Sequence, residues 1–140
     1  MIRRRKAMFE YKTQIFIHHT DAAGRLFFAN QFYLIHEAKE RFLESLGLSI
    51  RHILDDPRFT FPLVHAESDY KALLQAGDRI TIRAGIERIG ETSVTFIFSI
   101  FKADGSLAGT SRTVSVAVDR KTQAKTRIPA EWRVKFERAI

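Results

Sequence analysis

The feature that most constrains the fold is a single long amphipathic helix pattern that is followed by a series of alternating strands. Apolar residues between positions 30 and 46 recur at steps of three and four, which places them on one stripe of a helix. Asn30 suits the N-cap of this helix, and Gly47 suits the position just after its end. We therefore predict one helix over 30–46 with one apolar face. The stripe consists of Phe32, Ile35, Ala38, Phe42 and Leu46.

Most of the remaining chain has the pattern of strands joined by hairpins. Apolar and other residues alternate, and Gly90-Glu91 and Asp104-Gly105 fall between runs as turns. Residues 48–61 are expected to be irregular, and a short helix is expected over 129–138. The strands are predicted over 8–18, 62–71, 79–89, 93–101 and 112–118, the last alternating through Val114, Val116 and Val118.

One helix followed by consecutive hairpin-linked strands indicates an α+β fold, in which an antiparallel sheet packs one face on the helix. A single helix does not cover a five-stranded sheet fully. Ile97 and Phe101 also add apolar residues to the other face of their strand. We therefore expect a homo-oligomer.

Length and composition restrict the class of protein. The 140 residues suit a single domain over 1–140, and the absence of cysteine excludes disulfides, cysteine–zinc sites and a cysteine nucleophile. No apolar run approaches the roughly 20 residues of a membrane helix, and no signal-peptide segment follows the basic start. We expect a cytoplasmic protein with no membrane partner.

The net charge of +7 is concentrated at the ends of the chain. Lysines and arginines cluster in a basic N-terminal tail over 1–7 and in a basic C-terminal segment over 120–140, whereas the middle is nearly neutral. Solvated tails are the favoured interpretation. Nucleic-acid binding is not favoured, and the C-terminal residues could also help to hold a phosphorylated ligand.

The sequence motifs of several common enzyme classes are absent from this sequence. It has no G-x-S-x-G, no G-x-x-x-x-G-K-[ST], no G-x-G-x-x-G and no H-E-x-x-H. His18 and His19 are adjacent, so in a strand they would point to opposite faces and would not share a metal ion. We predict no metal site.

The run from Thr20 to Phe32 carries the functional signal. It places Asp21 in a loop of small residues, just before the predicted helix, whose first backbone N–H groups lack partners within the helix. A carbonyl can be both polarised and attacked at such a place. Asp is also common as an ordinary turn residue, which is the alternative interpretation.

This run resembles the signature of hotdog-fold acyl-CoA thioesterases of the 4-hydroxybenzoyl-CoA thioesterase type, and the resemblance extends from about Tyr11 to Trp132. It implies an antiparallel five-stranded sheet wrapped around one long helix, a dimer or dimer of dimers, an acyl-CoA substrate, and no metal or redox cofactor. The signature consists of Asp21-Ala-Ala-Gly24, Phe27-Phe28, Asn30, Phe32 and Glu37-Ala38. A second stretch is similar to the branch that hydrolyses 1,4-dihydroxy-2-naphthoyl-CoA in quinone biosynthesis, through Phe61 to Ala66, Asp69 and Gly77-Asp78.

The resemblance assigns roles to individual residues. Asp21 is the implied catalytic carboxylate, either as a nucleophile through a mixed anhydride or as a general base on water. Backbone N–H groups at Phe28 and Ala29 are the implied oxyanion donors. Core packing or interface roles are the alternatives for the Phe and His residues that we place in the substrate pocket. The pocket candidates are Gly24, Phe27, Asn30, His36, Phe61 and His65.

The coenzyme A contacts cannot be transferred from the aromatic-acyl relatives. Their basic cluster falls at the turn that here reads Gly90-Glu91-Thr92. Each basic residue that remains as a candidate also suits an ordinary exposed position. These candidates are Arg88, Lys102, Arg112, Arg120 and Lys121.

Three other functions fit the same fold. A hotdog hydratase pairs Asp with a His about five residues on, and Leu26 stands at that place. A non-catalytic hotdog protein that binds acyl groups or nucleic acid is a second alternative. A thioesterase for short or medium acyl chains is the third.

Overall fold

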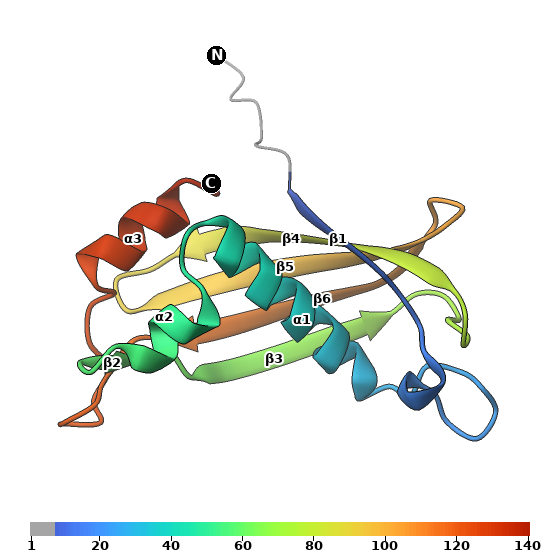
Figure 1. The fold of residues 1–140 in the computed structure, drawn as a ribbon, viewed down its shortest axis with the longest axis horizontal. Helices are drawn as coiled ribbons and strands as arrows, with labels where there is room; N and C mark the ends of the chain where they lie inside the picture. Colours follow the sequence, from blue (N-terminus) through green and yellow to red (C-terminus); the bar gives the residue numbers. More distant parts are fainter. Residues whose placement is uncertain (1–7) are drawn as a thin grey trace, which may run out of the picture.

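The computed structural model describes residues 8–140; the predicted basic tail over 1–7 lies outside the described residues. A five-stranded antiparallel sheet, ordered β1-β4-β5-β6-β3, curves around the long helix α1 (Figure 1). The bounds of these elements are β1 Phe9–Gln14, α1 Asn30–Ser45, β3 Leu63–Tyr70, β4 Arg79–Ile89, β5 Ser93–Lys102 and β6 Leu107–Val116. The prediction of an α+β fold with a five-stranded antiparallel sheet around one long helix is confirmed.

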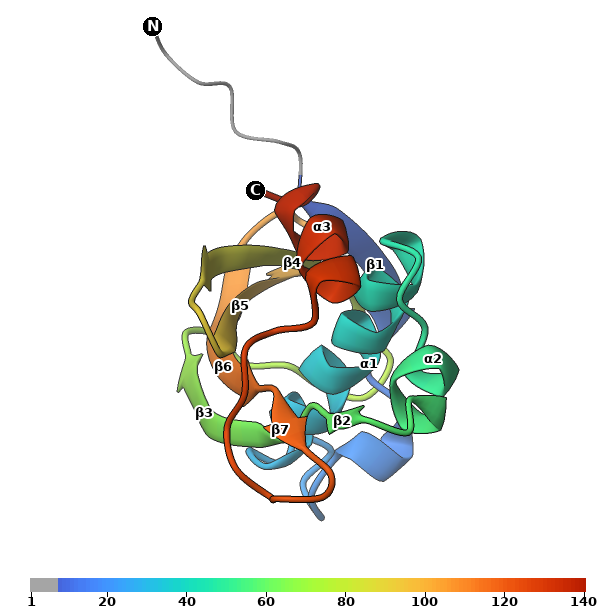
Figure 2. The same cartoon turned by 90° about the vertical axis from the view of Figure 1, so that its left-hand side faces the viewer.

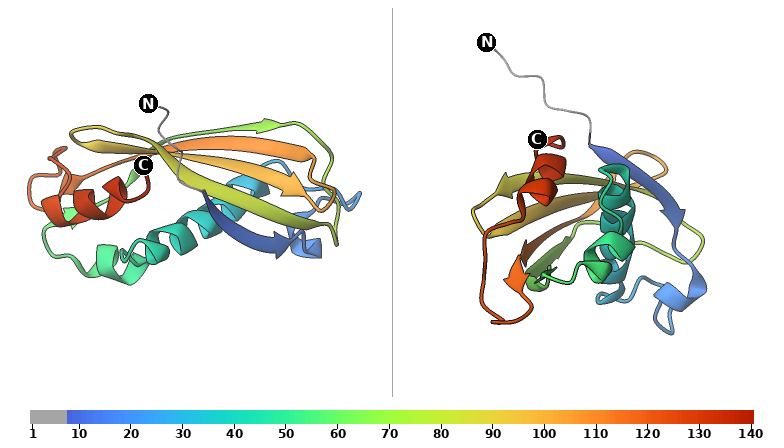
Figure 3. Two further views of the ribbon diagram at one scale, coloured as in Figure 1. Left: turned by 90° about the horizontal axis from the view of Figure 1, so that it is seen from above. Right: turned by 60° about the vertical axis from the view of Figure 1, so that its left-hand side comes forward.

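The core lies between α1 and the concave face of the sheet, which Figure 3 shows from above. Leu34, Ala38 and Phe42 of α1 are buried there. They meet the alternating apolar rows of β4 and β5, in which Ile82 and Phe96 are completely buried. The 3.6-residue period of the helix and the two-residue period of the strands therefore present their apolar faces to each other.

The strand predicted over 112–118 is displaced: β6 begins at Leu107 and ends at Val116, and Val118 belongs to β7. The inner face of β6 is also not its most apolar row. Val114 pairs with Thr95 of β5 and is only half-buried, whereas Ser111 and Thr113 pair with the buried rings of Phe98 and Phe96. The row that faces α1 is therefore small and polar: Gly109, Ser111, Thr113 and Ser115. The alternation predicted the strand, but the identity of the inner row depends on the register with β5.

The C-terminal end of α1 agrees with the sequence prediction, whereas the N-terminal end differs from it. Gly47 follows the helix with a φ of +81°, as predicted for a left-handed terminating residue. Asn30 is not the N-cap, because the cap position is Ala29 and no side chain caps it. The Asn30 amide Nδ2 instead donates to the His19 carbonyl at 2.8 Å. The Asn30 side chain therefore makes a tertiary hydrogen bond and does not cap the helix.

The predicted first strand is too long. β1 ends at Gln14, and Ile17–His19 form a short 3₁₀ helix, η1, in which the Phe16 N–H donates to His19 Nδ1 at 2.9 Å. His18 and His19 therefore do not alternate across a strand, and their rings lie 4.2 Å apart. Within residues 8–140, no group of side chains could hold a metal ion.

Residues 48–61 are more regular than expected. Ser49 Oγ accepts the His52 N–H at 3.2 Å and so caps α2, Ile50–Asp55. β2, Phe59–Thr60, then pairs with β7, Val118–Asp119, at the end of the molecule that Figure 2 shows.

The expected terminal helix is present as α3, Ala130–Glu137. Within the described part of the chain, no helix has the length and apolarity that crossing a membrane requires.

Candidate active site

Asp21 lies at the tip of a loop that folds back on itself just before α1. The Asp21 N–H donates to the Arg25 carbonyl at 2.8 Å, and the Gly24 N–H donates to the Asp21 carbonyl at 3.0 Å. Gly24 has a φ of +75°, a conformation that this tight reversal requires and that glycine adopts without strain. The signature of small residues therefore builds a defined turn that presents one acidic side chain.

The Asp21 carboxylate is exposed, and its own loop orients it. Oδ1 accepts the backbone N–H of Ala23 at 2.9 Å and that of Arg25 at 3.2 Å. Both bonds engage Oδ1, whereas no described group bonds Oδ2. Asp21 is thus an Asx-turn residue, as the alternative interpretation holds, and it still offers one oxygen for chemistry.

The base of this loop is joined to the start of α1. The Phe27 N–H donates to the His19 carbonyl at 3.0 Å, and the same carbonyl accepts the Asn30 amide. The neighbouring N–H groups of Phe28 and Ala29 have no acceptor among the described residues. Unpaired N–H groups at a helix start carry partial positive charge, which suits an oxyanion.

Two polar side chains hold the first turn of α1 against the sheet. Tyr70 at the end of β3 donates its hydroxyl to the Phe28 carbonyl at 2.6 Å. The buried Gln31 amide Nε2 donates to the Asp69 carbonyl at 3.2 Å and to Ser111 Oγ at 3.3 Å. The position of the Phe28 and Ala29 N–H groups is therefore set by β3 and β6.

A cavity of about 290 Å³ opens farther along α1, between this helix and β3; we call it the α1–β3 pocket. Its lining is mostly apolar. The polar groups in the lining are Lys39 and Thr113, which are 5% and 3% exposed, together with the outer residues Tyr33 and His36. The complete lining is Phe32, Tyr33, Ile35, His36, Lys39, Leu63, Ala66, Phe98 and Thr113.

Burial lowers the pKa of Lys39 from its ordinary value of 10.5 to about 8. The ammonium donates to Ser115 Oγ at 2.8 Å and lies 4.6 Å from the centre of the Phe96 ring. The pKa of His36 is lowered as well, first by burial and then by the charge of Lys39, while Glu40 opposes the shift.

The predicted pocket residues are dispersed in the structure. His36 lines the α1–β3 pocket. Phe27 and Phe28 are exposed, with ring centres 4.8 Å apart, beside the Asp21 loop. Phe61 packs in the aromatic core, stacked on Phe136 at 5.7 Å, so the structure does not bring it to the loop.

His65 also lies outside the pocket. It is exposed on β3, and its Nε2 is 3.6 Å from Glu67 of the same strand. Ala66, which lies between these two residues, lines the α1–β3 pocket, so His65 points to the opposite face of the sheet.

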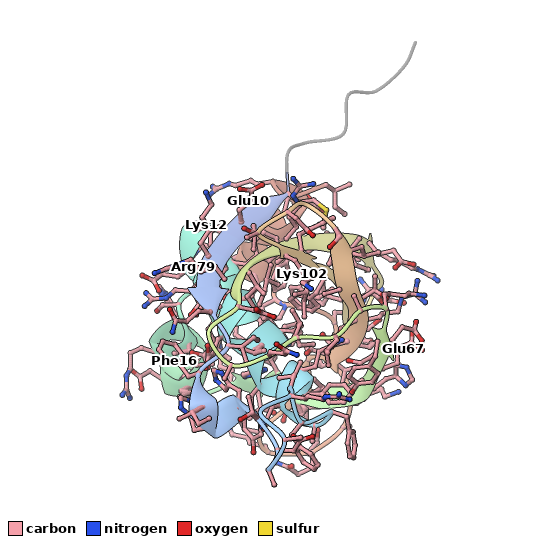
Figure 4. The ribbon with its side chains drawn as sticks, turned by 90° about the vertical axis from the view of Figure 1, so that its right-hand side faces the viewer. Glu10, Lys12, Phe16, Glu67, Arg79 and Lys102 are labelled. Carbon is pink, nitrogen blue, oxygen red and sulfur yellow. The ribbon has the colours of Figure 1, made fainter. Side chains whose placement is uncertain are left out.

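The candidate coenzyme A residues do not form one cluster. Lys102 ends β5 at the end of the sheet that holds the Asp21 loop, where Figure 4 shows it together with Lys12 and Arg79. Arg88 lies near the other end of β4, paired with Thr95. Lys12 and Arg79 were not expected, because nothing in their local sequence distinguishes them.

The other three candidates have structural contacts or lie far from the loop. Arg112 is bound in ion pairs with Glu87 and Glu67, at 2.8 and 3.4 Å. Arg120 donates to the carbonyls of Asp56 and Leu54. Lys121 is exposed in the turn after β7, at the α2 end of the molecule.

Sequence reasoning missed four residues that shape the site: Gln31, Lys39, Tyr70 and Thr113. Lys39 had one signal, because it lies four residues after Ile35 and three before Phe42 and so shares the apolar face of the helix, where a charged side chain is unusual. The roles of the others depend on which strand the helix contacts.

Comparison with known proteins agrees with this geometry. The model of the thioesterase-like superfamily matches residues 15–136, and the chain belongs to this family. A 1,4-dihydroxy-2-naphthoyl-CoA hydrolase of Rippkaea orientalis is 32% identical over 121 residues, which cover 85% of this chain and 88% of that one.

Two solved structures share the fold over nearly the whole chain. A 1,4-dihydroxy-2-naphthoyl-CoA thioesterase from Synechocystis has a TM-score of 0.86 and 28% identity, over 92% of this chain and 95% of its own. A gentisyl-coenzyme A thioesterase has a TM-score of 0.81 and 28% identity, over 91% and 99%. The predictions of a hotdog fold and of a thioester hydrolase are confirmed.

Proposed function

We propose that the protein hydrolyses the thioester of an aromatic acyl-CoA to the free acid and coenzyme A. One observation carries this proposal: the unpaired N–H groups of Phe28 and Ala29 lie at the start of α1, at the base of the loop that presents Asp21. Hydrolysis needs an oxygen nucleophile beside donors for the developing oxyanion, and this arrangement supplies both.

In this proposal the thioester oxygen accepts the N–H groups of Phe28 and Ala29. As a general base, Asp21 takes a proton from water while the water oxygen bonds to the carbonyl carbon. The C–S bond then breaks, and the proton passes to the departing thiolate. As a nucleophile, Asp21 instead forms a mixed anhydride with loss of the thiolate, and water hydrolyses the anhydride. Neither route uses a metal or redox cofactor.

The aromatic substrate is supported by the named relatives and by the site. The relative in Rippkaea orientalis acts on 1,4-dihydroxy-2-naphthoyl-CoA, and a structural neighbour acts on gentisyl-CoA. The α1–β3 pocket begins one turn after the Phe28 and Ala29 N–H groups, and Phe32 and Phe98 contribute to its mostly apolar lining. We propose 1,4-dihydroxy-2-naphthoyl-CoA as the first substrate to test.

We also propose a homodimer, formed through the free edge of β3. This strand pairs with β6 on one side only, and nearly all of its residues are exposed, including Leu63 and Val64. A long edge with exposed apolar residues is a template for pairing with another chain. Tyr70 at the end of this edge donates to the Phe28 carbonyl, so a second copy paired here would lie next to the start of α1. Light scattering after size exclusion tests the assembly.

The phosphates of coenzyme A need basic partners near the same loop. Lys102 is the predicted candidate that lies at this end of the sheet, and Lys12 and Arg79 accompany it (Figure 4). We propose that these three side chains attract the phosphates. The cytoplasmic location remains a prediction.

The decisive experiment compares Asp21→Asn with the wild type on a panel of aromatic and aliphatic acyl-CoAs, read by free-thiol release. An Asn oxygen can still accept the Ala23 and Arg25 N–H groups, so the loop is kept while the carboxylate is lost. We expect turnover to fall by about 10³-fold or more.

The matched control is Asp119→Asn, because Asp119 also accepts a backbone N–H two residues on, that of Lys121 at 2.8 Å, and lies in β7, away from the Asp21 loop and from Lys102. It should retain full turnover. An Asp21→Asn variant with the wild-type rate would refute the assigned role. A preference for short or medium aliphatic chains would replace the aromatic substrate.

Acyl binding without turnover by the wild type would favour the non-catalytic alternative. Salt-sensitive nucleic-acid binding without thioester cleavage would favour the nucleic-acid-binding alternative.

A further inference from the structure

The short helix η1 is closed by a side chain whose ability to accept a hydrogen bond depends on its protonation. The Phe16 N–H donates to His19 Nδ1 at 2.9 Å, and the Phe16 carbonyl accepts the His19 N–H at 2.9 Å, so these two residues bond each other twice. A Glu or Gln side chain usually provides this acceptor at the third position of a helix. An imidazole nitrogen provides it only while it carries no proton.

The same residue holds the base of the Asp21 loop through its backbone. The His19 carbonyl accepts the Phe27 N–H at 3.0 Å and the Asn30 amide at 2.8 Å. Phe27 directly precedes Phe28, whose N–H we assign to the oxyanion. Asp21 lies two residues after His19. One carbonyl therefore fixes the carboxylate and the oxyanion donors relative to each other.

The surroundings of the His19 ring favour its neutral form. His19 is 7% exposed, and burial lowers its pKa below the ordinary value of 6.5. Two charged groups also act on the ring. His18 of η1, whose ring centre is 4.2 Å away, lowers the pKa further, whereas Glu37 of α1, which the Tyr11 hydroxyl of β1 bonds, opposes the shift. His19 is therefore neutral at neutral pH and keeps its bond to Phe16.

Protonation of His19 would place a donor against a donor. A second N–H would form at Nδ1, directed at the Phe16 N–H, and two donors do not bond each other. The Phe16 N–H would then lie unpaired beside a charged ring, which is a costly arrangement in a buried place. The turn would open, and the His19 carbonyl at its end would move with it.

We propose that His19 is a positioning residue, whose neutral ring holds η1 closed and whose carbonyl thereby keeps the oxyanion donors in line with the Asp21 carboxylate. This inference rests on the proposed thioester hydrolysis and adds a group that controls it without touching the substrate. Acidification opens η1 and lowers turnover by misplacing the catalytic groups.

The test compares kcat across a range of pH for the wild type and His19→Gln, with an aromatic acyl-CoA as substrate. The Gln oxygen can accept the Phe16 N–H at every pH, because an amide does not titrate. The two enzymes should have similar kcat values at about pH 8. As the pH falls below 6.5, the variant should become faster than the wild type by about tenfold or more, since misplaced groups cost up to about 10²-fold in rate. Asp21 is present in both enzymes, so the ratio of their kcat values isolates His19.

A third variant removes the acceptor altogether. His19→Leu should lower kcat by about tenfold at every pH, a loss that Gln at the same position rescues. The matched control is His52→Gln, the same substitution at an exposed histidine of α2, beyond the other end of α1. Its kcat relative to the wild type should stay constant across the range. A constant ratio for His19→Gln would overturn the positioning role, and this comparison decides the question if His19→Leu does not fold.

Amide chemical shifts test the same link without turnover, so they remain decisive if no acyl-CoA is hydrolysed and the proposed function itself fails. In the wild type, the amide signals of Phe16 and Phe27 should move together on acidification, with one midpoint below pH 6.5. Neither signal should show this transition in His19→Gln. A transition at Phe16 that does not reach Phe27, or a wild type without any transition, would overturn the inference.

Discussion

The hydroxyl of Tyr70 donates a hydrogen bond of 2.6 Å to the carbonyl oxygen of Phe28. That carbonyl belongs to the same peptide unit as the Ala29 N–H, which has no acceptor among the described residues. A donor on the carbonyl polarises the peptide and strengthens the N–H at its other end. The last residue of β3 thereby orients the group that we assign to the oxyanion.

Tyr70→Phe is therefore expected to lower kcat by up to about tenfold with little change in KM, since one neutral hydrogen bond contributes about 1 kcal/mol. Steady-state kinetics that separate kcat from KM check this prediction. Tyr11→Phe is the control, because it removes the tyrosine hydroxyl that bonds Glu37 at 3.3 Å and leaves the Tyr70 bond to the Phe28 carbonyl in place. A wild-type kcat in Tyr70→Phe would show that the hydroxyl does not position the donor.

Gly109→Ala is expected to displace the first turn of α1. A Cβ at this position would lie 2.9 Å from both polar atoms of the Gln31 amide and 3.0 Å from the Asp69 carbonyl oxygen. Gln31 would lose its bonds to β3 and β6, and the N–H groups of Phe28 and Ala29 would shift. Small misplacements of this kind cost up to about 10²-fold in rate, which the thiol-release assay would measure.

Gly85→Ala is the control for this substitution. The Cβ there would meet Met8 Cε at 3.0 Å, and a flexible methionine end can move aside. Its turnover should stay close to that of the wild type. A Gly109→Ala enzyme with unchanged kcat would contradict the proposed link between Gln31 and the donors.

Stability should rise with pH because of Lys39. Burial lowers its pKa from 10.5 to about 8, so between these two values the unfolded chain binds more protons than the folded one. The destabilising contribution is complete below pH 8 and is lost as the pH rises toward 10.5. Each pKa unit corresponds to about 1.4 kcal/mol, so the total change is about 3 kcal/mol.

Urea unfolding at a series of pH values, with Lys39→Met for comparison, isolates this group. The free energy of unfolding of the wild type should gain about 3 kcal/mol relative to the variant between pH 7 and pH 10.5. A constant difference across this range would show that the Lys39 ammonium is not buried in solution.

Thr113→Val and Ser115→Ala should change stability in opposite directions. The Thr113 hydroxyl is buried without a partner, and its replacement by a methyl group should stabilise the protein by about 1 kcal/mol. Ser115 accepts the Lys39 ammonium, so its loss should destabilise by about 1–3 kcal/mol. Urea unfolding at pH 7 measures both, and a destabilised Thr113→Val variant would argue against an unpaired hydroxyl.

Local patterns were sufficient for most elements. The bounds of β4 agree with the predicted 79–89, and the helix predicted over 30–46 ends within one residue of α1. Gly24 and Gly47 have the positive φ values that their sequence positions required. The predictions failed where a distant contact decided the outcome, as with Asn30, whose amide bonds His19 rather than capping its helix.

The sequence by itself determined the long helix α1, the hairpin-linked strands and the Asp21 loop, because the spacing of apolar residues and the small turn residues act over a few positions. Only the tertiary structure decided that Gly109, Ser111, Thr113 and Ser115 face α1, that Lys39 is buried against them, and that Tyr70 reaches Phe28. These relationships join residues between 42 and 80 positions apart or set a strand face through its register. Such pairings depend on how whole elements pack, which no local spacing specifies.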